Sequence, residues 1–153
     1  MATQPSTAVR SARQEDVPAL ASLLAELFAL EADFVPDRDR QERGLRLLLD
    51  REDAACVVAE TGGELVGMAT VQIVVSTAEG GAAGLVEDVV VAQAHRRRGV
   101  GSALLAGLEQ WCRERGIERL QLLADRENAP ALSFYRQQGW TPTQLVALRR
   151  RVD

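Results

Sequence analysis

The chain has 153 residues, 46% of them hydrophobic, and its 18 basic and 22 acidic side chains give a net charge of −4. All the basic side chains are arginine, so Schiff-base chemistry and a Walker-type phosphate loop are excluded. One histidine, His95, excludes an H-E-x-x-H zinc site, and Cys56 and Cys112 do not resemble a zinc or disulfide framework. The acidic net charge argues against a nucleic-acid partner.

No linker, repeat or low-complexity tract divides the sequence, which predicts a single domain over residues 1–153. The N-terminal segment lacks an apolar signal core, and no apolar run approaches the roughly 20 residues of a membrane span. Two cysteines without an obvious partner suit a reducing compartment. We therefore expect a cytoplasmic protein with no membrane partner.

The two halves of the chain differ in charge. Residues 1–84 hold 7 arginines and 14 acids, whereas residues 85–153 hold 11 arginines and 8 acids. A basic C-terminal half suits an anionic ligand, and an acidic N-terminal half tolerates a cationic one.

Hydrophobic spacing and turn residues predict strands and helices that alternate along the chain. Asp16 as N-cap and Pro18 in the first turn mark the start of the first helix, and Gly62-Gly63 marks a hairpin turn. The expected order is a strand at 8–12, a helix from Asp16, a helix at 38–51, strands at 55–60 and 65–75, a flexible loop at 76–84, a strand at 85–91, a helix from Gly99 to Arg115 closed by Gly116, a strand at 120–124, a helix from Asn128 to Gly139, and a strand at 143–149. This order predicts an α+β fold of mixed α/β layers, with helices on the faces of a sheet.

The segment from His95 to Leu105 follows a strand and opens a helix. Gly99 and Gly101 allow a tight turn and a close approach of the backbone to a ligand. The first amides of a helix lack internal partners and lie at the positive end of its dipole. The turn is therefore suited to a pyrophosphate, and the arginines before it add attraction. A basic loop with glycines for the turn alone is the alternative reading.

The pattern Arg96-x-x-Gly99-x-Gly101, between a strand and an amphipathic helix, resembles the signature of the GNAT N-acetyltransferase superfamily. The segment NAPALSFYRQQGW, residues 128–140, resembles the second motif of that family, and the opening VRSARQEDVPAL resembles its entry into the first helix. The resemblance implies a GNAT-type fold, whose mostly antiparallel central sheet is splayed at its middle and flanked by about four helices. It also implies an acetyl-CoA-dependent N-acetyltransferase that needs no metal.

By this resemblance, two groups of residues bind acetyl-CoA. Backbone amides of the turn would hold the pyrophosphate, and the strand before it would offer backbone groups to the pantetheine arm and the thioester carbonyl. The implied residues are Val89, Val90, Val91, Arg96, Arg97, Arg98, Gly99, Val100, Gly101, Ser102 and, from the second motif, Asn128 and Tyr135.

An amine must lose a proton before it attacks the thioester, so a carboxylate near the acetyl group is expected. Glu87 and Asp88 lie just ahead of the strand segment that would meet the acetyl group. On a regular strand Glu87 shares its face with Val89 and Val91, which makes Glu87 the first candidate for the base. Asp88 is the second candidate, with a structural ion pair as its alternative role.

Tyr135 occupies the position at which the family donates a proton or a hydrogen bond to the departing CoA sulfur. Asn128 would cap its helix, touch the CoA arm, or do both. For Tyr135 the alternative is a ring packed on the sheet with its hydroxyl satisfied.

The acceptor would lie between the first two helices and the loop before the central strand, a region rich in acids. A small cationic amine of the polyamine, aminoglycoside or basic amino-acid type is therefore favoured over a protein N-terminus. A non-catalytic acyl-CoA-binding module remains the alternative function, and a homodimer joined by the C-terminal strand is a further expectation. The acids considered are Glu26, Glu31, Asp33, Asp37, Asp39 and Glu79.

Overall fold

A five-stranded sheet is the central element of a computed structural model, which describes residues 3, 5–31 and 33–153. Neighbouring strands follow the chain order, and each pair is antiparallel except the last, which is parallel. The strands are β1 (Thr7–Ser11), β2 (Ala54–Thr61), β3 (Glu64–Ser76), β4 (Gly81–Val91) and β5 (Leu120–Leu122). The expected α+β fold with a mostly antiparallel sheet is confirmed.

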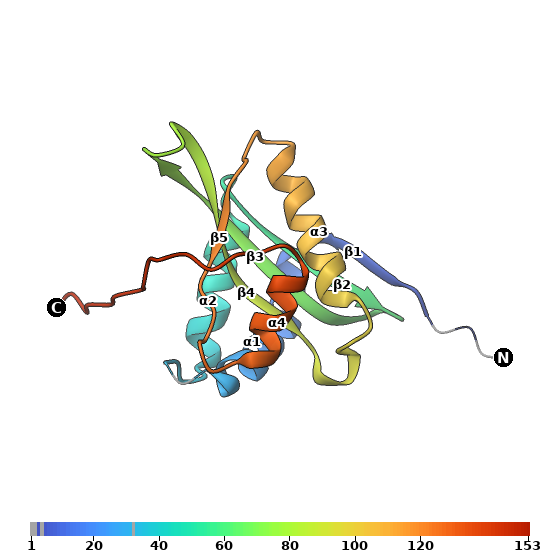
Figure 1. Cartoon of the computed structure of the whole chain (residues 1–153). Coiled ribbons are helices and arrows are strands. Elements are labelled where there is room, and N and C mark those ends of the chain that lie inside the picture. The colour runs from blue at the N-terminus through green and yellow to red at the C-terminus, as the bar shows by residue number, and fades with distance from the viewer. Residues whose placement is uncertain (1–2, 4, 32) are drawn as a thin grey trace. The chain divides into compact units, whose positions relative to one another are not determined.

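The chain forms two compact units, Met1–Leu122 and Leu123–Asp153. The first unit holds the whole sheet, and the second holds one described helix (Figure 1). The helices of the first unit are α1 (Val17–Leu30), α2 (Arg38–Leu49) and α3 (Val100–Arg113), with short 3-10 turns at Gln14–Asp16 and Gln93–His95; the second unit contains α4 (Ala129–Gln137).

Within the first unit, α1 and α2 cover one face of the sheet and α3 covers the other (Figure 1). On the first face, Leu20 and Leu24 of α1 share a buried cluster with Met68 of β3. On the second face, a Cβ atom built on Gly67 would come within 2.9 Å of Leu104 Cδ1 of α3. Because Gly67 and Met68 are consecutive on a strand, their side-chain positions point to opposite faces, as the two helix layers require.

The short predicted strand at 8–12, the two first helices and the glycine hairpin are all present. Gly62 and Gly63 both have positive φ values, +57° and +82°, which is the backbone of a tight two-residue hairpin turn. Gly116 follows α3 with φ +69°, so the predicted left-handed helix end is also confirmed.

The flexible loop predicted at 76–84 is wrong in its extent. Only residues 77–80 form a turn, and β4 already begins at Gly81. One of the glycines that suggested a loop, Gly84, is instead needed for packing. A Cβ on Gly84 would lie 2.6 Å from Leu120 Cδ2 and 3.1 Å from Val71 Cγ2, so only glycine lets β5 approach β4 here.

The strand predicted at 143–149 is also wrong. The structure describes these residues without regular secondary structure, and Leu145, Val146 and Leu148 are exposed. Alternating apolar residues favour a strand only where a neighbouring strand supplies hydrogen bonds, and none of the described strands pairs with this segment.

Asp16 precedes α1 as predicted, but its carboxylate does not cap that helix. It accepts a hydrogen bond from the Arg13 backbone amide at 2.7 Å and pairs with Arg10 at 2.8 Å. The hydrogen bond from Arg10, followed by the Arg13 amide, lowers the pKa of Asp16 despite its burial. This pair therefore fixes the entry from β1 into α1.

Candidate active site

The turn ahead of α3 has the backbone geometry of an anion-binding loop. Arg97 and Gly99 have positive φ values, +62° and +80°, with Arg98 between them. Backbone alternation of this kind directs successive N–H groups to one side. Gly99 is the N-cap of α3 and has no side chain to cap it, so the first amides of α3 face the same turn.

Arg96 connects this turn to the end of β4. Its Nε donates a hydrogen bond to the backbone oxygen of Val91 at 3.0 Å. This bond joins the end of β4 to the turn, and these are the two parts to which the family resemblance assigns acetyl-CoA.

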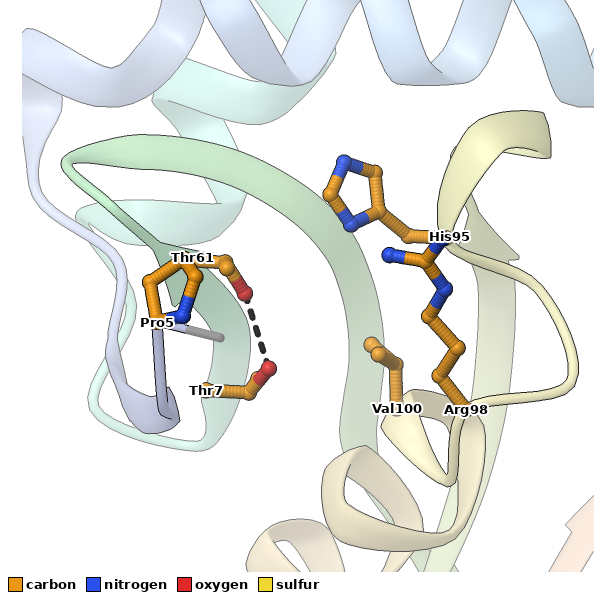
Figure 2. Close-up of a pocket in the computed structure, with 6 residues that line it drawn as sticks. All are labelled: Pro5, Thr7, Thr61, His95, Arg98 and Val100. Carbon is orange, nitrogen blue, oxygen red and sulfur yellow. Dashed lines mark hydrogen bonds between the residues drawn. The ribbon is translucent and has the colours of Figure 1, made fainter. Parts of the chain in front are cut away.

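A pocket of about 370 Å³ lies beside the turn on the side of β1 and β2. Figure 2 shows the side chains of His95 and Arg98 on one side of the space, facing residues from the two strands. Because the guanidinium of Arg98 borders the pocket, its interior favours negative charge. The remaining lining residues are Pro5, Thr7, Thr61 and Val100, with a 2.8 Å hydrogen bond between the two threonine hydroxyls.

A β-bulge interrupts β4 at the acidic pair. Met68 is opposite Val90 and Thr70 is opposite Glu87, so one residue of β3, Ala69, is opposite two residues of β4, Asp88 and Val89. Asp88 lies in the bulge with φ +49°, a left-handed conformation that aspartate tolerates better than most residues.

The bulge changes which side chains of β4 lie on the same face of the sheet. Met68 and Thr70 share one face of β3, so their partners Val90 and Glu87 share one face of β4. The expectation that Glu87 shares its face with Val91 is therefore wrong, because the extra residue reverses the alternation beyond Asp88. Glu87 is exposed, whereas Asp88 is partly buried.

Burial raises the pKa of Asp88 to about 7, and the negative charges of Glu87 and Glu31 add to the effect. Burial, with the charges of Asp88 and Asp16, also raises the pKa of the Cys56 thiol to about 12. Asp88 is thus a carboxyl that can both take up and release a proton near neutral pH, as a general base requires. Cys56 is kept as a thiol and is unsuited to act as a nucleophile.

The second-motif residues lie in the other compact unit. The Asn128 side chain accepts a hydrogen bond from the Ala131 amide at 3.2 Å, so the predicted cap of α4 is confirmed. The Tyr135 ring contacts Phe134 and Trp140, with centroid separations of 5.4 and 6.1 Å. The catalytic and CoA-binding roles of Asn128 and Tyr135 stay predictions.

Two of the acids considered for the acceptor have structural partners. Asp37 accepts a hydrogen bond from the Arg40 amide at 3.1 Å and so caps α2, and Glu79 pairs with Arg119 at 3.5 Å. Glu31 differs from them because its charge acts on Asp88. Of the acids considered, Glu31 is therefore the one whose charge is connected with the bulge of β4.

Thr70 is a residue that the sequence reasoning did not select. Its hydroxyl donates a hydrogen bond to the backbone oxygen of Glu87 at 3.0 Å, at the start of the bulge. A threonine is common in strands, and nothing in the sequence around it indicates a role.

Two negative findings apply to the described residues. No group of three or more His, Cys, Asp or Glu side chains among them is placed to hold a metal ion. Within the same residues, no helix has the length and apolar composition to cross a membrane.

Comparison with known proteins assigns the chain to a class. Residues 19–140 match the model of the acetyltransferase (GNAT) family. Aminoglycoside N(6')-acetyltransferase type 1 of Stenotrophomonas maltophilia is 30% identical over 93% of this chain and 91% of its own length. The chain therefore belongs to the GNAT acetyltransferase family, and the prediction of an N-acetyltransferase is confirmed at the level of the family.

Other relatives extend the comparison. The aminoalkylphosphonate N-acetyltransferase of Salmonella typhimurium is 28% identical over 89% of this chain and 86% of its own. The solved structure of an aminoglycoside N-acetyltransferase, AAC(6')-Iy in complex with CoA, superimposes with a TM-score of 0.83 over 99% of this chain and 98% of its own; at 18% identity it shows the fold alone. Two curated relatives match only in part: the chain spans 24% of the Bacillus subtilis N-acetyltransferase YobR and 29% of the streptothricin acetyltransferase of Streptomyces lavendulae.

Proposed function

We propose that this protein transfers the acetyl group of acetyl-CoA directly to a primary amine of a small cationic molecule. The observation that carries the proposal is the spacing of two features along one segment. A partly buried carboxyl in a strand bulge, Asp88, is followed by an anion-binding turn at the N-terminus of α3, with residues 89–91 between them.

The parts of acetyl-CoA match successive parts of the segment from Asp88 to the start of α3. The backbone amides of residues 97–102 would hold the pyrophosphate, and Arg96, Arg97 and Arg98 would supply positive charge. β5 pairs with β4 only from Gly84 to Val86, so the edge of β4 beyond Val86 has no described strand partner on that side. The pantetheine arm would form hydrogen bonds to the backbone of Val89, Val90 and Val91 along this edge.

The structure favours Asp88 over Glu87 as the proton acceptor. A general base is most effective when its pKa lies near the working pH, and the pKa of Asp88 is raised to about 7. In the reaction the neutral amine attacks the thioester carbonyl, the carbon–sulfur bond breaks, and the amine proton goes to Asp88. The thiolate of CoA takes a proton from the phenol of Tyr135, directly or through water.

A cationic acceptor is supported by the acids around the bulge and by the relatives. Glu31, Glu87 and Asp88 would surround the attacking amine with negative charge. The printed names of relatives include acetyltransferases of aminoglycosides and aminoalkylphosphonates, which are small amines. We propose this class of acceptor over a protein N-terminus.

A homodimer in a reducing cytoplasm is part of the same proposal. Both cysteines are free and buried, and the exposed Leu145, Val146 and Leu148 of the C-terminal segment offer an apolar surface for a second copy. Light scattering over a concentration series tests this assembly.

The activity is tested by measuring CoA release from acetyl-CoA with a panel of cationic, neutral and acidic amines. We expect turnover with cationic amines, a loss of about 10²-fold or more in kcat for Asp88→Asn, and a smaller loss for Tyr135→Phe. Glu87→Gln is the matched control, because it removes the neighbouring carboxylate and leaves the partly buried one. If CoA binds and no amine accelerates its release, the non-catalytic acyl-CoA-binding module replaces the enzyme.

A larger loss for Glu87→Gln than for Asp88→Asn would instead assign the base to Glu87. Turnover restricted to neutral or acidic amines would contradict the proposed acceptor class.

A further inference from the structure

Thr70 is a buried polar residue in the middle of β3, on the face that packs against α1. Its side chain is 1% exposed, and it lies between Cys56 of β2 and Glu87 of β4 in the sheet register. The same face carries Val58 and Met68 in an apolar cluster, where a valine would pack as well as a threonine. A buried hydroxyl without a partner is destabilising, so the hydrogen bond that Thr70 forms explains why a hydroxyl is tolerated at this position.

The hydrogen bond of Thr70 is made to the peptide group that joins Glu87 to Asp88. The hydroxyl donates to the backbone oxygen of Glu87 at 3.0 Å. Because a peptide group is planar, holding this oxygen also fixes the orientation of the Asp88 amide nitrogen. The φ angle of Asp88, +49°, is the rotation about the next bond, so the hydrogen bond acts directly on the strained residue.

We propose that Thr70 is a positioning residue for the proton acceptor: its hydroxyl holds the bulge in its observed geometry and keeps the partly buried Asp88 carboxyl beside the acetyl-transfer site. This inference rests on the proposed function and deepens it. Thr70 does not touch the substrates in this assignment, and it acts only through the peptide group before Asp88.

The consequence is a change in the protonation of Asp88 when the hydroxyl is lost. The charged groups that act on Asp88 are Glu87 on its own strand and Glu31 after α1, whereas Cys56 on β2 is a neutral thiol whose own pKa is raised by burial and by the charge of Asp88. None of these carries positive charge, and burial is the largest cause of the raised pKa. A looser bulge admits water, which favours the carboxylate and lowers the pKa of Asp88.

The test compares Thr70→Val, which keeps the shape and removes the hydroxyl, with Thr70→Ser, which keeps the hydroxyl. The pH profile of kcat is measured with one acceptor throughout, so that the titration of the acceptor is common to all variants. In Thr70→Val we expect the acidic limb of the kcat profile to shift to lower pH by about one unit. We also expect kcat to fall about tenfold, with KM for acetyl-CoA unchanged. In Thr70→Ser the limb stays at its native position.

Val58→Ala is the matched control for a destabilised core. Val58 belongs to the same cluster and is fully buried, and its truncation leaves a cavity without changing the Glu87 hydrogen bond. The inference would be overturned if the acidic limb of the kcat profile stayed at its native pH in Thr70→Val, or if it shifted by the same amount in Val58→Ala.

A carbon-13 NMR titration of the Asp88 carboxyl separates this inference from the proposed function. The titration midpoint should fall in Thr70→Val and be retained in Thr70→Ser, whether or not an amine is acetylated. Absence of turnover in the native protein would reject the proposed function, whereas equal midpoints in all three proteins would reject the role of Thr70.

Discussion

The carboxyl of Asp88 links the candidate chemistry to the stability of the fold. Its pKa is raised from an ordinary 3.8 to about 7, so the folded protein holds this proton more tightly than the unfolded chain does. The contribution of the group to the free energy of unfolding is therefore fully present below pH 3.8. It is lost progressively as the pH rises through about 7.

Asp88→Asn should accordingly stabilise the protein at about pH 8, by up to about 4 kcal/mol at roughly 1.4 kcal/mol per pH unit between the two pKa values. Asparagine also tolerates the left-handed backbone of this position. Urea denaturation at about pH 8 and at about pH 4 measures the effect, which should nearly vanish at the lower pH. Glu87→Gln is the control and should show no comparable gain. Lower stability of Asp88→Asn at both pH values would contradict the burial argument.

At the level of single residues, the sequence allowed only part of the candidate site to be predicted. Two adjacent acids in an apolar strand predicted a special position, because a carboxylate there is costly without a role. The choice between Glu87 and Asp88 depended on regular alternation, and the bulge breaks it. A bulge is one extra residue relative to the neighbouring strand, so a single strand's sequence does not reveal it.

The turn before α3 is the element that decides binding of the proposed CoA. Gly99 has φ +80°, and an added Cβ would meet no atom within 4 Å, so an alanine there is strained by its backbone alone. Gly99→Ala should weaken acetyl-CoA binding about tenfold, which corresponds to about 1.4 kcal/mol, within the usual strain of a left-handed residue.

Gly116→Ala is the control for that substitution. Gly116 also has a positive φ, +69°, and open space around its Cβ position, but it follows the other end of α3. Both variants should lose similar stability in thermal melts, and only Gly99→Ala should lose affinity in calorimetric titrations with acetyl-CoA. Equal affinities would show that the backbone of the turn does not hold the ligand.

Helices and turns that are determined by residues close in the sequence could be predicted. Strands that depend on contacts with residues distant in the sequence could not. The apolar spacing of α1 and the Gly62-Gly63 turn gave correct elements because their causes lie within a few residues. β4 begins earlier than expected because Gly84 is selected by its contact with Leu120, 36 residues later. The segment 143–149 has the right alternation and no described strand beside it.

On the scale of the whole molecule, the residues that the family resemblance assigns to CoA are divided between the two compact units. The turn and the bulge belong to Met1–Leu122, whereas Asn128 and Tyr135 belong to Leu123–Asp153. A ligand that binds both units should therefore reduce the local opening of the second one.

Hydrogen exchange measures this effect directly. None of the α4 side chains that the structure describes is buried, so its amides should exchange faster than those of α3. Saturation with acetyl-CoA should slow exchange at residues 97–102 and in α4 together. Protection of the turn without protection of α4 would contradict the assignment of Asn128 and Tyr135 to the CoA site.

The short pairing between β4 and β5 has a consequence for handling the protein without its ligand. Beyond Val86, the outer side of β4 presents backbone donors and acceptors that no described strand satisfies. Such an edge is a template on which an extended segment of another chain can add, which is a common route to aggregation. In the proposed complex the pantetheine arm covers this edge. Acetyl-CoA would then protect the chain against misassembly as well as supply its acetyl group, and depletion of the ligand would shorten the working life of the enzyme in solution.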